Sequence, residues 1–191
     1  MKKWLVVMGL AAAMALPALA DTTTWQIDPN HANAQFFVKH LGISTVQGEF
    51  TKVTGTVTVD NSDITKSTVD VTIPTDTVYT RVAMRDNDLK SEHFLDVAKY
   101  PDITFKSTSI SKTGDDTYDV NGDLTIRGVT KPETLKVTEL SKPIDVKMMG
   151  GWRQGASATL TINRQDFGVA ADPGMVGNDI RILIDIEMTH K

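Results

Sequence analysis

The chain has 191 residues, of which 40% are hydrophobic and 23% charged, an ordinary composition for a globular domain. The formal net charge is −4. Because nucleic-acid recognition requires a basic face, this acidic balance argues against a nucleic-acid partner, and it also argues against electrostatic docking on anionic lipid. Cysteine is absent from the sequence, which excludes disulfides, thiolate catalysis and an acylated lipoprotein cysteine.

Residues 1–20 have the pattern of a secretory signal peptide. Lys2 and Lys3 precede a mostly apolar stretch that is too short to span a bilayer, and Ala18-Leu19-Ala20 forms an A-x-A cleavage site. No later segment approaches the length of a membrane span. We therefore expect cleavage after Ala20 and a single domain over residues 21–191, exported to a bacterial periplasm.

The exported part reads mainly as strands with period-two alternation. We expect antiparallel strands with one buried face, because apolar residues alternate with polar ones, often threonine, and turn sequences separate the runs. The runs lie at residues 34–40, 53–59, 69–73, 120–126, 156–162 and 180–188, with weaker ones near 103–105 and 135–137. About eight strands without βαβ alternation predict an all-β sandwich or barrel.

One segment, Thr80 to Lys99, interrupts this rhythm. Thr80 is a candidate N-cap for a helix from Arg81 to Lys90, and a second helical turn is expected after Ser91. Pro101 ends helical geometry before the next strand. Met84, Leu89 and Phe94 would form an apolar side that packs across one end of the barrel.

Three glycines lie on the apolar, inward parity of the strands: Gly48, Gly55 and Gly122. Two readings remain open. Missing side chains on the inner face would leave room for one small ligand in a barrel of about eight strands, or each glycine would mark a bend or bulge.

The sequence lacks common catalytic and metal motifs. It has no G-x-S-x-G elbow, no glycine-rich phosphate loop and no H-E-x-x-H sequence. The four histidines do not have the spacing of metal ligands. His40 falls on the inward parity beside Phe36 and Val38, which suggests a hydrogen-bonded barrel histidine. We expect no catalytic residue and no metal.

Four blocks of the sequence form a recognisable set: HANAQFFVKHLGISTVQGEF (31–50), RDNDLKSEHFLDVAKYPDITFKST (85–108), NGDLTIRGVTKP (121–132) and NRQDFG (163–168). Together they resemble the YceI-like family. Their order and spacing also agree with the family. Three positions depart from its usual pattern: Ala32, Ala34 and Asp88, the last standing where a histidine is usual.

The resemblance implies an eight-stranded, antiparallel, lipocalin-like β-barrel with one or two short helices across one end. It also implies a long pore that binds a polyisoprenoid, an isoprenoid quinone or a similar fatty chain, in the periplasm and often in a dimer. No cofactor is required. Combining this with strand parity, we expect ligand-binding residues at Phe36, Val38, His40, Gly48, Phe50, Val71, Ile73, Met84, Arg85, Leu89, Phe94, Phe105, Gly122, Leu124, Ile126 and Trp152.

Two alternatives compete with a lipid carrier. In one, the protein is an enzyme that acts on such a lipid with His40 as base, although no nucleophile or orienting carboxylate is paired with His40 at recognisable spacing. In the other, a closed barrel with a filled interior works through protein contacts.

Overall fold

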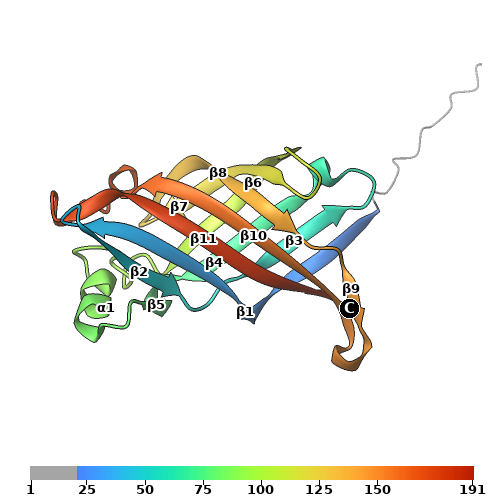
Figure 1. The fold of residues 1–191 in the computed structure, drawn as a ribbon, viewed down its shortest axis with the longest axis horizontal. Coiled ribbons are helices and arrows are strands. Elements are labelled where there is room, and N and C mark those ends of the chain that lie inside the picture. Colours follow the sequence, from blue (N-terminus) through green and yellow to red (C-terminus); the bar gives the residue numbers. More distant parts are fainter. Residues whose placement is uncertain (1–20) are drawn as a thin grey trace, which may run out of the picture.

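The computed structural model describes residues 21–191 and folds them into one antiparallel sheet that closes on itself (Figure 1). Eight strands form the ring, in the order β11-β10-β8-β7-β6-β4-β3-β1, and β1 pairs with β11 to close it. The strands are β1 (Thr22–His40), β2 (Ser44–Phe50), β3 (Thr54–Asp60), β4 (Thr68–Pro74), β5 (Val78–Tyr79), β6 (Asp102–Lys112), β7 (Tyr118–Ile126), β8 (Val129–Leu140), β9 (Ile144–Val146), β10 (Gly151–Asn163) and β11 (Val176–His190). The predicted eight-stranded antiparallel barrel is confirmed.

The inner face of the barrel follows the predicted alternation. On β11, Ile180, Ile182, Ile184 and Ile186 all face the interior, while Arg181 points outward and lies 4.1 Å from the centre of the Phe37 ring. The weak apolar runs near 103–105 and 135–137 belong to the long strands β6 and β8. Period-two patterning therefore located the barrel wall correctly.

Strand β1 is bent, and on the edge away from β11 it pairs with a different strand on each side of the bend. Its pairing with β11 passes from Ile27 opposite Met188 to Ala32 opposite Ile186, so extra residues bulge out of β1 around Pro29. The Asp28 carboxylate accepts hydrogen bonds from the backbone N–H of Asn30 and from the His31 ring, and the first of these contributes most to lowering the pKa of Asp28. Before the bulge β1 pairs with β3, and after it β1 pairs with β2.

The predicted helical interruption is present, with corrections. The helix is α1 (Ala83–Lys90), which begins two residues later than predicted, and residues 91–99 form turns where a second short turn was expected. Thr80 is not the N-cap: its hydroxyl donates to the Asp86 carboxylate, and Val82 precedes the helix without a side-chain cap. Four short 3₁₀ helices complete the elements found in residues 21–191: η1 (Ile64–Lys66), η2 (Thr75–Thr77), η3 (Lys147–Met149) and η4 (Arg164–Phe167).

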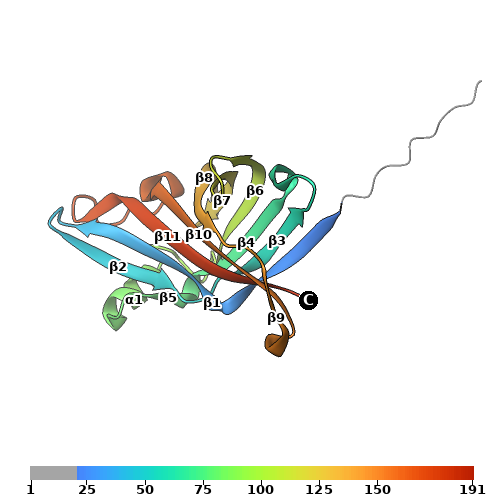
Figure 2. The same cartoon turned by 45° about the vertical axis from the view of Figure 1, so that its right-hand side comes forward.

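The two ends of the barrel differ, as both ribbon views show (Figures 1 and 2). At one end, here named the covered end, α1 and the turns of residues 91–99 lie beside β2 and β5. At the other, here named the arm end, the hairpin containing β9 projects past the ring near the C-terminus. Within residues 21–191 we find no helix with the length and apolar character that crossing a membrane requires. The predicted signal peptide, residues 1–20, lies outside the described residues.

Candidate functional site

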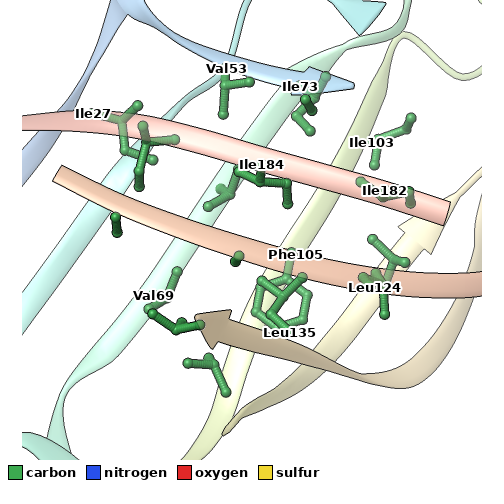
Figure 3. Close-up of a pocket in the computed structure, with 18 of the residues that line it drawn as sticks. Ile27, Val53, Val69, Ile73, Ile103, Phe105, Leu124, Leu135, Ile182 and Ile184 are labelled. Carbon is green, nitrogen blue, oxygen red and sulfur yellow. The ribbon is translucent and has the colours of Figure 1, made fainter. Parts of the chain in front are cut away.

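The interior of the barrel is a cavity of about 640 Å³ (Figure 3). Side chains from the ring strands converge on it, including Ile73 from β4, Phe105 from β6, Leu124 from β7 and Ile184 from β11. The volume lies within the range of about 300–1,000 Å³ that is typical of small-molecule sites. An eight-stranded barrel is just wide enough to hold one such ligand.

Many side chains of the cavity wall point inward and yet are only half-buried. Val57, Val71, Ile182, Ile184 and Ile186 keep part of their surface accessible although they lie on the inner face. In a filled core these aliphatic side chains would be fully enclosed by neighbours. Their accessible surface is therefore the wall of a hollow, and that wall is almost entirely hydrocarbon.

Eleven of the sixteen predicted site residues line this cavity. They are Phe36, Val38, Phe50, Val71, Ile73, Leu89, Phe94, Phe105, Leu124, Ile126 and Trp152. The five that do not line it are His40, Gly48, Met84, Arg85 and Gly122. Whether the eleven contact a ligand stays a prediction.

The two glycines do not create the cavity, which corrects the reasoning from missing side chains. A Cβ atom added at Gly48 would lie 2.2 Å from Cζ of Phe36, and one added at Gly122 would lie 2.5 Å from Cζ of Phe105. Each glycine is thus covered by a phenylalanine ring. Gly55 differs, since its φ of +156° and its close approach to the Asp70 carbonyl mark a backbone constraint.

The other three exceptions have local causes. His40 is the last residue of β1 and pairs with Ser44, beyond the point where the cavity wall on β1 ends at Val38. Arg85 turns towards Thr80, where its Nε donates to the hydroxyl and a terminal nitrogen donates to the carbonyl, each at 2.8 Å. Met84 is 83% exposed, so the expectation that it packs on the barrel is wrong.

Sequence reasoning missed part of the wall. The isoleucines of β11 lie on the predicted inner face but were not named as site residues, although their alternation is the clearest in the chain. Val57, Val69 and Leu135 were missed in the same way. The signal that could have found these residues is their position on the apolar, inward-facing side of each strand.

Arg164 is the charged residue of the cavity wall, and it lies at the covered end. It is 4% exposed and donates three hydrogen bonds to the backbone carbonyls of Val169, Val176 and Gly177, at 2.7–2.9 Å. Desolvation lowers the pKa of this guanidinium, while the Asp172 carboxylate acts in the opposite direction. These three hydrogen bonds use the donors of the buried guanidinium and hold the loop that follows η4 in place.

The arm end of the cavity carries polar groups. Thr23, Asn61, Gln154 and His190 lie on its wall there, together with Trp152, which is 44% exposed. His190 contacts the Thr24 carbonyl through Nδ1 at 3.0 Å. A ligand with an apolar tail and a polar head would therefore meet hydrogen-bonding partners at this end and hydrocarbon further in.

In the part of the chain that the structure describes, two groups of histidine and carboxylate side chains lie close together outside the cavity. One is Asp28, His31 and Glu187, and the other is Asp88, His93 and Asp172; within each, the ligand atoms lie within 4.8 Å of one another. The His93 ring faces Asp88 at 3.2 Å through Nδ1 and Asp172 at 3.8 Å through Nε2. Because the two ring nitrogens face different carboxylates, this arrangement suits surface ion pairing better than a shared cation.

Comparison with known proteins agrees with this geometry. Protein YceI of Escherichia coli O17:K52:H18 is 39% identical over 189 residues, which cover 98% of this chain and 97% of that protein. The crystal structure of the Campylobacter jejuni YCEI protein is 32% identical, with a TM-score of 0.71 over 80% of this chain and 90% of that one.

A more distant structure shares the fold. The polyisoprenoid binding domain from Saccharophagus degradans is 14% identical, with a TM-score of 0.65 over 88% of this chain and 99% of that one.

The sequence model of the YceI-like domain family matches residues 25–188 of this chain, which run from the buried Trp25 of β1 to the buried Met188 of β11. The chain therefore belongs to the YceI-like domain family.

Proposed function

We propose that this protein is a periplasmic carrier that holds a polyisoprenoid or a similar long-chain amphiphile, such as an isoprenoid quinone, inside its barrel. The observation that carries the proposal is the hollow, hydrocarbon-walled interior. From Ile180 to Met188 the inner face of β11 extends about 26 Å along the strand, at about 3.3 Å per residue. A wall of this length suits an extended chain better than a compact ligand.

The energetics support a binding role without chemistry. Burial of a hydrocarbon chain contributes about 0.8 kcal/mol per CH₂, so a ten-carbon stretch contributes roughly 8 kcal/mol before the costs of ordering. The description of the Saccharophagus degradans domain as polyisoprenoid-binding adds a precedent for this ligand class in the same fold. The predicted signal peptide supports the periplasmic location.

Two observations support the carrier proposal over the competing functions. The enzyme hypothesis required His40 to reach the ligand, and His40 does not line the cavity. The hypothesis of a barrel that acts only through protein contacts required an inner face filled by side chains. Many inward side chains are instead only half-buried, because they border the cavity.

Native mass spectrometry of the protein from an osmotic-shock fraction, prepared without detergent, tests the proposal. We expect a polypeptide that begins at Asp21 and carries a noncovalent adduct, which organic extraction identifies as a species with a long unsaturated hydrocarbon tail. Retention of Met1 in a membrane fraction would contradict the location. Repeated preparations that contain no lipid and bind no prenyl compound would contradict the carrier role.

A further inference from the structure

The hairpin at the arm end projects beyond the wall of the barrel. We name residues 142–153 the mouth arm. Its strand β9 pairs only with residues 151–153 of β10, whereas β8 pairs with β10 further along, from Ala156 to Thr159. In both ribbon views the mouth arm extends away from the ring of strands, at the end opposite α1 (Figures 1 and 2).

The mouth arm exposes apolar side chains instead of packing them. Met148 is 99% exposed, Ile144 60% and Met149 55%. Gly150, with a φ of +70°, turns the chain directly after the two methionines and so places them at the tip. Methionine side chains are flexible and polarisable, so a methionine-rich tip adapts to a soft apolar environment.

The mouth arm is continuous with the cavity. Pro143 at its base and Trp152 on its returning strand both line the cavity wall. Thr23, Asn61 and His190 lie on the same wall at this end. The base of the mouth arm therefore borders the cavity at this end.

The charges of the mouth arm suit a membrane surface, unlike the acidic chain as a whole. Lys142 and Lys147 are both exposed, the first shortly before Ile144 and the second directly before Met148, and Asp145 is the one acidic group of the segment. Arg153 is held by Glu187, with Nε 3.3 Å from the carboxylate. Lysine and tryptophan beside exposed apolar residues are typical of segments that lie at a lipid interface.

We propose that the mouth arm docks on a lipid bilayer and inserts Ile144, Met148 and Met149 into it, so that the cavity mouth meets the membrane from which the lipid is loaded. This inference rests on the proposed carrier function. A second copy of the chain is a poorer occupant, because a stable protein interface uses about 20–30 residues on each side. A convex tip with a few apolar side chains cannot supply that area, whereas a bilayer needs no matching shape.

The test is flotation with vesicles of phosphatidylethanolamine containing a minor share of phosphatidylglycerol. We expect the double variant Met148→Glu/Met149→Glu to lose about tenfold or more of the vesicle-bound fraction relative to the unchanged chain, because it removes two inserted side chains and adds two charges. The matched control is Ile43→Glu/Met175→Glu. It changes side chains that are 83% and 51% exposed on turns outside the mouth arm, and it should float like the unchanged chain. All variants keep residues 1–20 in the same form, so any contribution from that segment is common to all.

Binding of a soluble short prenol, measured on the same variants without vesicles, separates this inference from the carrier function. We expect the mouth-arm variant to keep its prenol affinity and to load prenyl lipid from vesicles more slowly. Equal flotation of the mouth-arm variant and the unchanged chain would overturn the inference, as would a loss of flotation in the control alone. A dimer in light scattering that the mouth-arm variant dissociates would identify a protein interface and also overturn it. Flotation that depends on the mouth arm without prenol binding would sustain membrane docking and overturn the carrier function.

Discussion

Two phenylalanine rings occupy the space that two glycines leave on the inner face of the barrel. Phe36 stands directly opposite Gly48 in the pairing of β1 with β2. Phe105, on β6, covers Gly122 of β7, whose position also lies close to the Lys106 carbonyl. An aromatic ring that covers a strand glycine is a known way to restore packing across a sheet. The cavity therefore lies beyond the rings rather than above the glycines.

Gly122 should consequently be intolerant of a side chain. The Cβ atom of a Gly122→Ala variant would lie 2.5 Å from both the Phe105 ring and the Lys106 carbonyl oxygen, and the carbonyl cannot move without breaking the strand. We expect a loss of about 1–3 kcal/mol in the free energy of unfolding, measured by urea denaturation.

Gly155→Ala is the control for this variant. Its Cβ atom would meet nothing closer than 3.7 Å, so a change of within about 0.5 kcal/mol is expected. Unchanged stability in Gly122→Ala would mean that the ring moves freely and that Gly122 does open space in the cavity.

Whether a glycine on the inner face opens space or is covered by a neighbouring side chain depends on the register of the two strands. The sequence placed Gly48 and Gly122 correctly on the inner face, because that requires only the period of two. Which side chain lies across from a glycine depends on how two strands are aligned. That alignment is set by turns and bulges, such as the break in β6–β7 pairing between Ser107 and Ser109, which the pattern of apolar residues does not reveal.

At the level of elements, the covered end is sealed mainly by the turns that follow α1. No residue of α1 is fully buried, whereas Phe94 in the next turn is 6% exposed and belongs to the core. Leu89 at the end of the helix and Leu95 beside Phe94 also line the cavity, and the Leu95 amide donates to the Leu89 carbonyl at 3.0 Å. The interruption was located from the sequence, but the sealing residues were only partly identified.

Truncation of Phe94 should show where the seal lies. Phe94→Ala removes a buried ring from the cavity wall and should cost about 3–5 kcal/mol in the free energy of unfolding. Met84→Ala, in the same segment, should change it by no more than about 0.5 kcal/mol, because Met84 is in solvent. Thermal and urea unfolding of both variants provide the measurement. A greater loss in Met84→Ala than in Phe94→Ala would mean that the helix itself forms the seal.

Across the whole molecule, closure of the ring depends on the longest strands, β1 and β11. Alternation in the sequence identified residues 34–40 and 180–188, yet the strands extend over Thr22–His40 and Val176–His190. The additional length comes from pairing: the first part of β1 is held by β3 and β11, so even the polar stretch near Thr24 becomes strand. Long-range pairing of this kind overrides local propensity.

A hollow barrel gives up some stability that a ligand can restore. Half-buried isoleucines on β11 lack the close packing of a dense core, and dispersion contacts are lost wherever a neighbour is missing. A bound chain would supply those contacts, and a ligand present at about 100 times its dissociation constant stabilises a folded protein by about 2.7 kcal/mol. Under the proposed carrier function, a bound chain would complete the packing of the cavity wall.

The most direct test of this account is the affinity of the protein for prenols of increasing chain length. If the barrel encloses an extended tail, affinity should rise by at least about tenfold for each added five-carbon unit until the cavity is full, and then level off. Ala158→Phe places a ring on the cavity wall in the middle of β10 and should shorten the longest chain that still gains affinity, while Thr159→Phe, at the neighbouring position that is not part of the wall, should leave the series unchanged. The account would be contradicted by an affinity that does not depend on chain length and is unchanged by Ala158→Phe.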